Sequence, residues 1–246
     1  DDIGPTLLAK RLRDNDDFVR FAKIAIPPLP YDPIDGPKDV VERACFAIER
    51  SWSLYHYGKN ILTSALQHAT ARALGMTVPT EKNEDLASKV KAFDEAFGPA
   101  LDAYVQAQYD ETQSQLAAAG IKRVTLARGL SFGTYRAMDN PLSRLGGVNV
   151  RRYISDTSGP PLSSWTENRS VAIAFGRGLV SHTPGALAIA KLPAKDIQAT
   201  FYSGLGSGTE VEYIVRSGKV PALVDTWAAD AGPTNDDYPA LFEGLN

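Results

Sequence analysis

The sequence predicts an α+β fold in which a helical N-terminal half precedes a strongly bent β-sheet. Two observations lead to this prediction. Apolar residues recur at helical spacing up to about residue 119, and they alternate at the strand period of two after Gly120. No flexible linker marks the change of period, which falls between residues 118 and 122. We therefore expect a helical region over 1–119 and a sheet domain over 120–246, packed directly against each other.

The helical half contains apolar stripes typical of amphipathic helices. Cys45, Ile48 and Trp52 lie on one face of a helix within 38–58, and Trp52 is expected to be a core residue. Further helices are expected over 61–76, 85–97 and 99–120. Gly98 and Pro99 separate the last two, because proline suits the first turn of a helix and breaks its interior. A proline-rich loop covers 26–37.

The second half contains short β-rich runs bounded by glycine, proline or polar turns. They cover 122–130, 147–154, 185–192, 208–215 and 219–227. One short helix is expected among them, over 167–175.

Composition limits the classes of function. Hydrophobic residues make up 43% of the 246 residues, and the net charge of −3 gives no overall basic surface for duplex nucleic acid. A single cysteine, Cys45, and three histidines without metal-ligand spacing lead us to expect no disulfide and no metal site. Without a signal-peptide pattern or an apolar run long enough for a membrane helix, we expect a cytoplasmic protein with no membrane contact.

The run "GTEVEYIV" places Glu210 and Glu212 one residue apart. In a strand these side chains would point to the same face, where two carboxylates repel each other and one pKa is raised. Such a pair fits either the solvent face of an edge strand or an active site. Two further motifs precede it in the sequence. "VTLARGL" carries Arg128 and Gly129, and "PLSSWTENRSVAIAF" carries the triplet Ser164-Trp165-Thr166 ahead of a helix.

These three motifs, in this order, resemble the mono-ADP-ribosyltransferases of the arginine–serine–glutamate class, which include cholera-toxin-like and iota-toxin-like enzymes. That class has a strand arginine, an S-T-S-like triplet and a final E-x-E or Q-x-E. The resemblance covers residues 120–225. It implies a split, bent, mixed β-sandwich and an enzyme that consumes NAD as a co-substrate, releases nicotinamide and needs no metal. A glutamate at the earlier E-x-E position is in this family the mark of an arginine acceptor.

The resemblance also implies roles for individual residues. Glu212 would stabilise the oxocarbenium-like ribose, and Glu210 would orient the acceptor and accept its proton. Ser164 would hydrogen-bond Glu212 and fix its rotamer. Arg128 would bind the NAD diphosphate or ribose, and the backbone of Gly129 would meet the nicotinamide amide.

The remaining positions implied by the resemblance lie around these residues. Trp165 and Thr166 complete the triplet, with Trp165 replacing the family's middle threonine. Phe175 would stack on the nicotinamide side of the cofactor, and Arg177 lies near the position of a second phosphate-binding arginine. Tyr202, in "FYSGLGSG", would help to recognise the acceptor, although it lies farther upstream than the family's usual aromatic residue.

Several alternatives stay open at this stage. The acceptor could be a nucleobase of RNA or DNA instead of a protein arginine, or water, which would make the chain an NAD glycohydrolase. Outside enzymology, a phage-associated structural or binding module with a degenerate transferase fold is the alternative. A toxin or effector of this family would have a cognate antitoxin or immunity partner.

Overall fold

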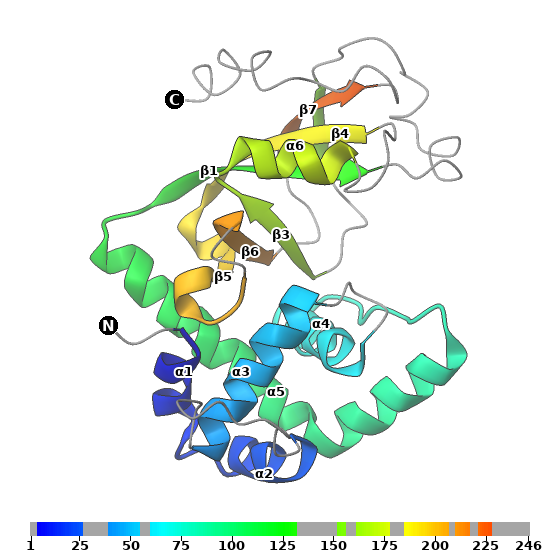
Figure 1. Cartoon of the computed structure of the whole chain (residues 1–246), viewed down its shortest axis with the longest axis vertical. Helices are drawn as coiled ribbons and strands as arrows, with labels where there is room; N and C mark the ends of the chain where they lie inside the picture. Colours follow the sequence, from blue (N-terminus) through cyan, green and yellow to red (C-terminus); the bar gives the residue numbers. More distant parts are fainter. Residues whose placement is uncertain are drawn as a thin grey trace.

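A computed structural model describes residues 4–26, 39–54, 60–131, 152–155, 161–177, 185–206, 210–216 and 221–227 (Figure 1). The helices are α1 (Gly4–Leu12), α2 (Asp16–Ala25), α3 (Val40–Leu54), α4 (Ile61–Ala73), α5 (Glu84–Ala118) and α6 (Arg169–Arg177). The strands are β1 (Arg123–Ser131), β2 (Arg152–Ser155), β3 (Leu162–Thr166), β4 (Gly185–Pro193), β5 (Ile197–Thr200), β6 (Glu212–Arg216) and β7 (Pro221–Trp227). The chain is therefore α+β, and helix gives way to strand between Ala118 and Arg123.

Asparagine side chains begin three helices of the N-terminal half. Asn15, Asn60 and Asn83 each accept backbone N–H groups from the first turn of α2, α4 and α5. An N-cap of this kind satisfies amide groups that have no partner within the helix. These caps fix where the helices start after the preceding turns.

The prediction of two helices separated at Gly98 and Pro99 is wrong, because α5 runs through both residues over 35 positions. Pro99 lies on the exposed side of α5, where water can satisfy the carbonyl group that loses its donor. Residues on either side contribute to the helical core: Leu101 is buried in it, and Phe97 packs against it. Tertiary packing therefore outweighs the local penalty of the proline.

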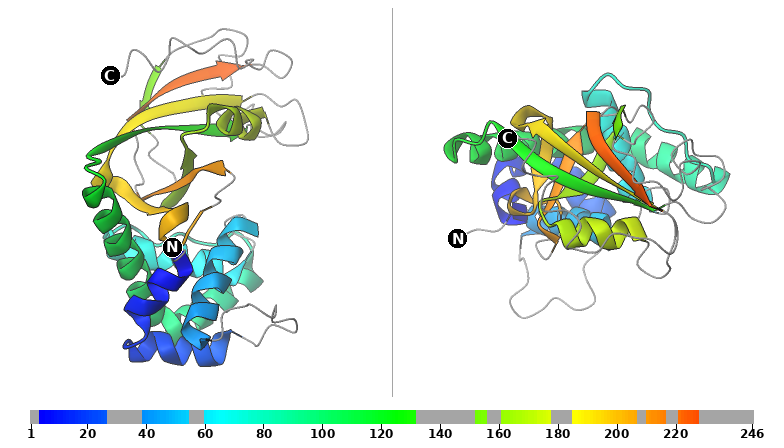
Figure 2. Two further views of the ribbon diagram at one scale, coloured as in Figure 1. Left: turned by 60° about the vertical axis from the view of Figure 1, so that its left-hand side comes forward. Right: turned by 90° about the horizontal axis from the view of Figure 1, so that it is seen from above.

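The strands form one sheet in the order β2-β7-β4-β1-β3-β6-β5. Every pairing among the described strands is antiparallel, so the prediction of a mixed sheet is wrong: alternation identifies a strand but does not encode its direction. β1 pairs with β4 over nine residues, whereas it pairs with β3 only through Ala127 and Thr166. Beyond that pair the two strands diverge, which Figures 1 and 2 show as β3 running obliquely away from β1.

The single β1–β3 pair divides the sheet into two strand groups, β2-β7-β4-β1 and β3-β6-β5, which pack face to face. Buried residues of β1 and β4 meet Trp165 of β3 and Val215 of β6 in one hydrophobic core, closed at one end by Leu116 of α5. The opposite face of β1 carries α6. In Figure 2 the strands β1, β4 and β7 lie farther from the helical half than β3, β6 and β5, and α6 lies beside β1 and β4.

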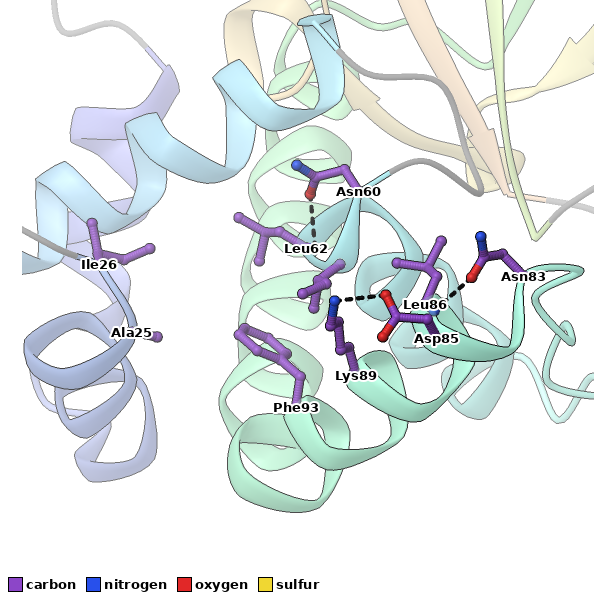
Figure 3. Close-up of a pocket in the computed structure, with 10 residues that line it drawn as sticks. Ala25, Ile26, Asn60, Leu62, Asn83, Asp85, Leu86, Lys89 and Phe93 are labelled. Carbon is purple, nitrogen blue, oxygen red and sulfur yellow. Dashed lines mark hydrogen bonds and ion pairs between the residues drawn. The ribbon is translucent and has the colours of Figure 1, made fainter.

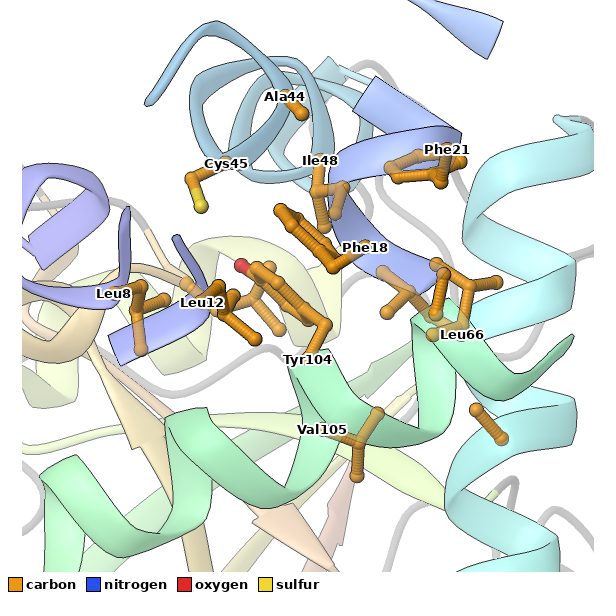
Figure 4. Packing of buried hydrophobic residues seen from close by; sticks show 14 of the residues in the cluster. Leu8, Leu12, Phe18, Phe21, Ala44, Cys45, Ile48, Leu66, Tyr104 and Val105 are labelled. Carbon is orange, nitrogen blue, oxygen red and sulfur yellow. The ribbon is translucent and has the colours of Figure 1, made fainter. Parts of the chain in front are cut away.

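The helical half and the strand group β3-β6-β5 share a second core. Tyr104 and Phe18 stack at 6.0 Å between ring centroids, and Cys45 and Ile48 of α3 lie beside them (Figure 4). Leu162 of β3 and Ile214 of β6 belong to the same cluster. The face of β3 and β6 that carries Leu162 and Ile214 is thus covered by helices and not by water.

Two of the strands were not among the predicted β-rich runs. They are β3, which carries the serine triplet, and β5. The predicted run 147–154 is described only over Arg152–Ser155, and its first part lies outside the described residues. The short helix predicted over 167–175 forms two residues later, as α6.

Candidate active site

The three motif strands, far apart in the sequence, are neighbours in the sheet. Ala127 of β1 lies opposite Thr166 of β3, and Thr166 lies opposite Glu212 of β6. Residues opposite each other in antiparallel strands extend their side chains to the same face. This cross-strand row therefore brings the start of the E-x-E strand and the end of the serine triplet to one place, next to Arg128.

The side chains of Ser164 and Arg128 lie on opposite faces of the sheet. Ser164 is two residues from Thr166 in β3, so its exposed side chain shares the face of Thr166 and Glu212. Arg128 directly follows Ala127, and alternation places its half-buried side chain on the opposite face of β1, the one that carries Leu126. The structure thus places Arg128 at the point where β1 and β3 diverge, on the face opposite that of Glu212.

Strand alternation does not explain the glutamate pair, which corrects the expectation that both residues lie in one strand. β6 begins only at Glu212, and Val211 between the two glutamates has a φ of 47°. Left-handed backbone is unusual for a β-branched residue and marks a strained turn of a kind that clusters at functional sites. Glu210 therefore projects from a turn and Glu212 from the strand.

Thr166 holds this turn in place. Its hydroxyl donates to the carbonyl oxygen of Glu210 at 2.5 Å and accepts from the backbone N–H of Asn168 at 2.8 Å. The Asn168 side chain in turn accepts from the N–H of Ser170 at 3.1 Å, at the start of α6. One threonine hydroxyl therefore links the turn of Glu210 to the loop that starts α6.

Glu212 is 7% exposed and lies between the two halves of the molecule. The indole N–H of Trp52, on the last turn of α3, donates to its Oε1 at 3.3 Å. A Cβ added to Gly206 would lie 3.3 Å from the Glu212 Cβ and 3.4 Å from its Oε2, so only a glycine fits closely there. Among the hydrogen bonds of the described residues, none joins Ser164 to Glu212. Trp52 occupies the position that the sequence analysis gave to Ser164.

The two carboxylates interact electrostatically. Partial burial, and secondarily the charge of Glu212, raise the pKa of Glu210 above its usual value. This direction agrees with the expectation that one pKa of the pair is raised. A carboxylate with a raised pKa is a stronger base, which suits a group that must take a proton from an acceptor.

Gly129 is needed for the packing of α6 against β1. A Cβ there would lie 1.9 Å from the carbonyl oxygen of Ala172 and 2.3 Å from the N of Gly176, both in α6. The missing side chain thus lets α6 dock on β1. Phe175 of the same helix is half-buried, and the side chain of Arg177 lies outside the described residues.

Trp165 does not lie at the candidate site. Its indole is 4% exposed in the core between the strand groups, where the ring N–H donates to the Ser163 hydroxyl at 3.0 Å. Trp165 leaves β3 on the face opposite that of Thr166, because adjacent strand residues alternate. Its expected part in cofactor binding therefore finds no geometric support.

Tyr202 projects from an anchored turn. Its side chain is 66% exposed, while the next residue, Ser203, is buried and its hydroxyl accepts from Thr112 of α5 at 2.7 Å. Tyr104 donates to the carbonyl oxygen of Gly204 at 3.1 Å. The turn that carries Tyr202 is thus fastened to the helical half and leads to Gly206 beside Glu212.

A pocket of about 660 Å³ opens elsewhere, between the end of α2, the start of α4 and the first turns of α5 (Figure 3). No residue of the candidate site lines it. Within the described ranges, no three His, Cys, Asp or Glu side chains gather as a metal site. The helices of the same ranges include none with the length and apolar character to cross a membrane.

Comparison of the chain with protein-family models, with curated proteins and with solved structures gave no match. The motifs and the geometry of the site are therefore the basis for assigning a function.

Sequence reasoning missed Trp52 as a site residue. Its helical spacing with Ile48 and Cys45 is that of a core residue, and it does pack against the helical core. Only its position in the last turn of α3, facing a strand 160 residues later, gives it a second role. No local pattern carries that information.

Proposed function

We propose that the chain is a mono-ADP-ribosyltransferase that cleaves NAD, releases nicotinamide and transfers ADP-ribose, with a protein arginine as the acceptor. The observation that carries the proposal is the cross-strand row that joins the three motif strands at Thr166 and Glu212. Neighbouring strands of this kind are what the resemblance to the arginine–serine–glutamate class implies. In this proposal, the divergence of β1 and β3 would correspond to that family's divided sandwich.

The chemistry assigns a separate task to each glutamate. The bond between nicotinamide and the ribose carbon breaks, nicotinamide leaves with the bonding electrons, and positive charge develops on the sugar. Buried Glu212 would stabilise that charge, since a fixed carboxylate acts strongly in a low-dielectric site. A nitrogen of the acceptor guanidinium then bonds to the ribose carbon, and Glu210 takes the proton that this nitrogen loses.

The other site residues would bind and orient the reactants. A guanidinium suits phosphate oxygens, so Arg128, where β1 and β3 diverge, would hold the diphosphate of NAD. Exposed Tyr202, on the turn that precedes the glutamates, would contact the acceptor. Phe175 and Arg177 on α6 remain candidates for the nicotinamide side and for a second phosphate contact.

Nicotinamide release from NAD by the purified full chain tests the proposal. We expect release by the wild type and a loss of at least about a hundredfold in Glu212→Gln, because the neutral amide keeps the shape but not the charge. Glu81→Gln is the matched control, since Glu81 is a buried carboxylate in the helical half, 8% exposed against 7% for Glu212.

Labelled NAD with a cell lysate then identifies the acceptor. Label that protease removes and nuclease does not would support a protein acceptor, and the reverse would indicate a nucleobase. Nicotinamide release without labelling would indicate a glycohydrolase. A wild type that neither releases nicotinamide nor transfers label would overturn the proposal.

A further inference from the structure

Helix α3 of the helical half reaches the candidate catalytic carboxylate. The Trp52 indole N–H to Glu212 Oε1 distance of 3.3 Å joins residues that are 160 positions apart. Figure 1 shows α3 rising through the helical half toward the strand group of β3 and β6. A long-range contact to a buried carboxylate at the start of a motif strand needs an explanation beyond the packing of α3.

We propose that Trp52 is a positioning residue that holds the Glu212 carboxylate for the reaction. The inference rests on the proposed function and gives the helical half a part in it. It also assigns to a residue outside the sheet the role that the resemblance gives to Ser164.

The geometry around Glu212 supports this role. Donation to Oε1 fixes the rotation of the carboxylate plane, and with it the direction of Oε2. A Cβ added to Gly206 would lie 3.4 Å from Oε2, so the Gly206 backbone is near the second carboxylate oxygen. The indole donor and the Gly206 backbone therefore lie next to different oxygens of Glu212.

Trp52 itself is held firmly enough to orient another group. Its half-buried ring packs against the helical core. The preceding residue, Ser51, is 7% exposed, and its hydroxyl donates to Asn60 Oδ1 at 3.0 Å and lies 3.0 Å from Thr63 Oγ1. These bonds tie the end of α3 to α4, so the indole projects from an anchored turn.

The test uses Trp52→Phe, which keeps an aromatic ring but removes the indole N–H donor together with the volume of the second ring. We expect kcat for nicotinamide release to fall about tenfold, equal to ~1.4 kcal/mol, and the Kd for NAD to stay within about twofold. The drop appears in kcat because an orienting bond acts on the reacting carboxylate and not on the bound cofactor. Thr70→Ala is the control: Thr70 is buried in α4 and its hydroxyl donates to the carbonyl oxygen of Leu66 at 2.9 Å, away from Trp52 and Glu212, so the variant lowers the melting temperature and leaves kcat unchanged.

An NMR measurement checks the contact without any activity. The chain has three tryptophans, and the indole N–H cross-peak that disappears in Trp52→Phe identifies Trp52. Glu212→Ala should move that peak upfield. The peak of Trp165, which donates to Ser163 on the other face of β3, should stay in place as the internal reference.

Three outcomes decide the matter. An active wild type with an unchanged kcat in Trp52→Phe overturns the inference and leaves the proposed function intact. A Trp52 peak that does not respond to Glu212→Ala overturns it as well, even if Trp52→Phe fails to fold. A wild type without nicotinamide release overturns the proposed function and the inference together.

Discussion

Replacing Gly129 with alanine tests the docking of α6 on β1. The added Cβ would lie 1.9 Å from the Ala172 carbonyl oxygen and 2.3 Å from the Gly176 N. Both are backbone atoms of one helix, so no side-chain rotation relieves the overlap and α6 must move away from the strand. Overpacking of a well-filled site typically costs about 1–3 kcal/mol, and a clash with backbone on this scale belongs at the upper end.

The expected loss of about 3 kcal/mol translates into a melting temperature lower by about 6–12 °C for a chain of this size. Thermal unfolding followed by circular dichroism measures it. Gly98→Ala is the matched control. Gly98 lies inside α5, where a Cβ would be 3.5 Å from the nearest atom of Arg72, an ordinary contact. We expect that variant to stay within about 1 kcal/mol of the wild type, because the better helix propensity of alanine is offset by the ring of Pro99, which disfavours helical backbone for a preceding residue with a Cβ.

A Gly129→Ala protein that melts within about 1 °C of the wild type would refute the reasoning, since α6 would then not need the glycine. If the variant keeps its stability and loses NAD binding alone, Gly129 serves the cofactor, as the resemblance implies, and not the helix.

Three further predictions concern the charged residues of the site. Glu210→Ala should reduce transfer to protein far more than NAD hydrolysis, because a guanidinium acceptor depends on a base to remove its proton more than water does. Equal losses would contradict the division of labour with Glu212. Arg128→Ala should raise the Kd for NAD at least about tenfold by titration calorimetry, as expected for the loss of a charged hydrogen bond, and unchanged affinity would remove Arg128 from the site. Because its folded-state pKa is raised, Glu210 contributes stability that is present below its ordinary pKa of 4.5 and lost as pH rises through the raised value. Glu210→Gln should therefore melt higher than the wild type at about pH 7 and lose this advantage at about pH 3, and a pH-independent difference would contradict the burial argument.

The fold class followed from periodicity because each half has one dominant period. The change from 3.6 to two near residue 120 marks the end of α5 and the start of β1. Pro99 does not break α5, contrary to the prediction, because local propensity carries no information on the packing of Phe97 and Leu101 in the helical core. β5 has only four residues, Ile197–Thr200, and although apolar and polar residues alternate in it, so short a run does not stand out from the flanking sequence.

The residue types of the candidate site could be predicted from the sequence, but the directions in which their side chains point could not. The motifs led to strands that turned out to be neighbours, which their order in the sequence does not dictate. The face of Arg128 depends on its register against β3, and the separation of Glu210 from Glu212 depends on the left-handed backbone at Val211. Sequence alternation assumes a regular strand, and here β6 starts at Glu212, two residues too late to include Glu210.

The core that the helices share with β3 and β6 makes the two halves of the chain inseparable. Cutting the chain after residue 119 would expose the apolar side chains of Leu162, Leu205 and Ile214 to water. It would also remove the indole of Trp52 from the carboxylate of Glu212. A fragment of that kind is a different molecule, prone to self-association, whose inactivity would say nothing about the intact protein. Experiments that seek the smallest active piece should therefore begin at the first helix.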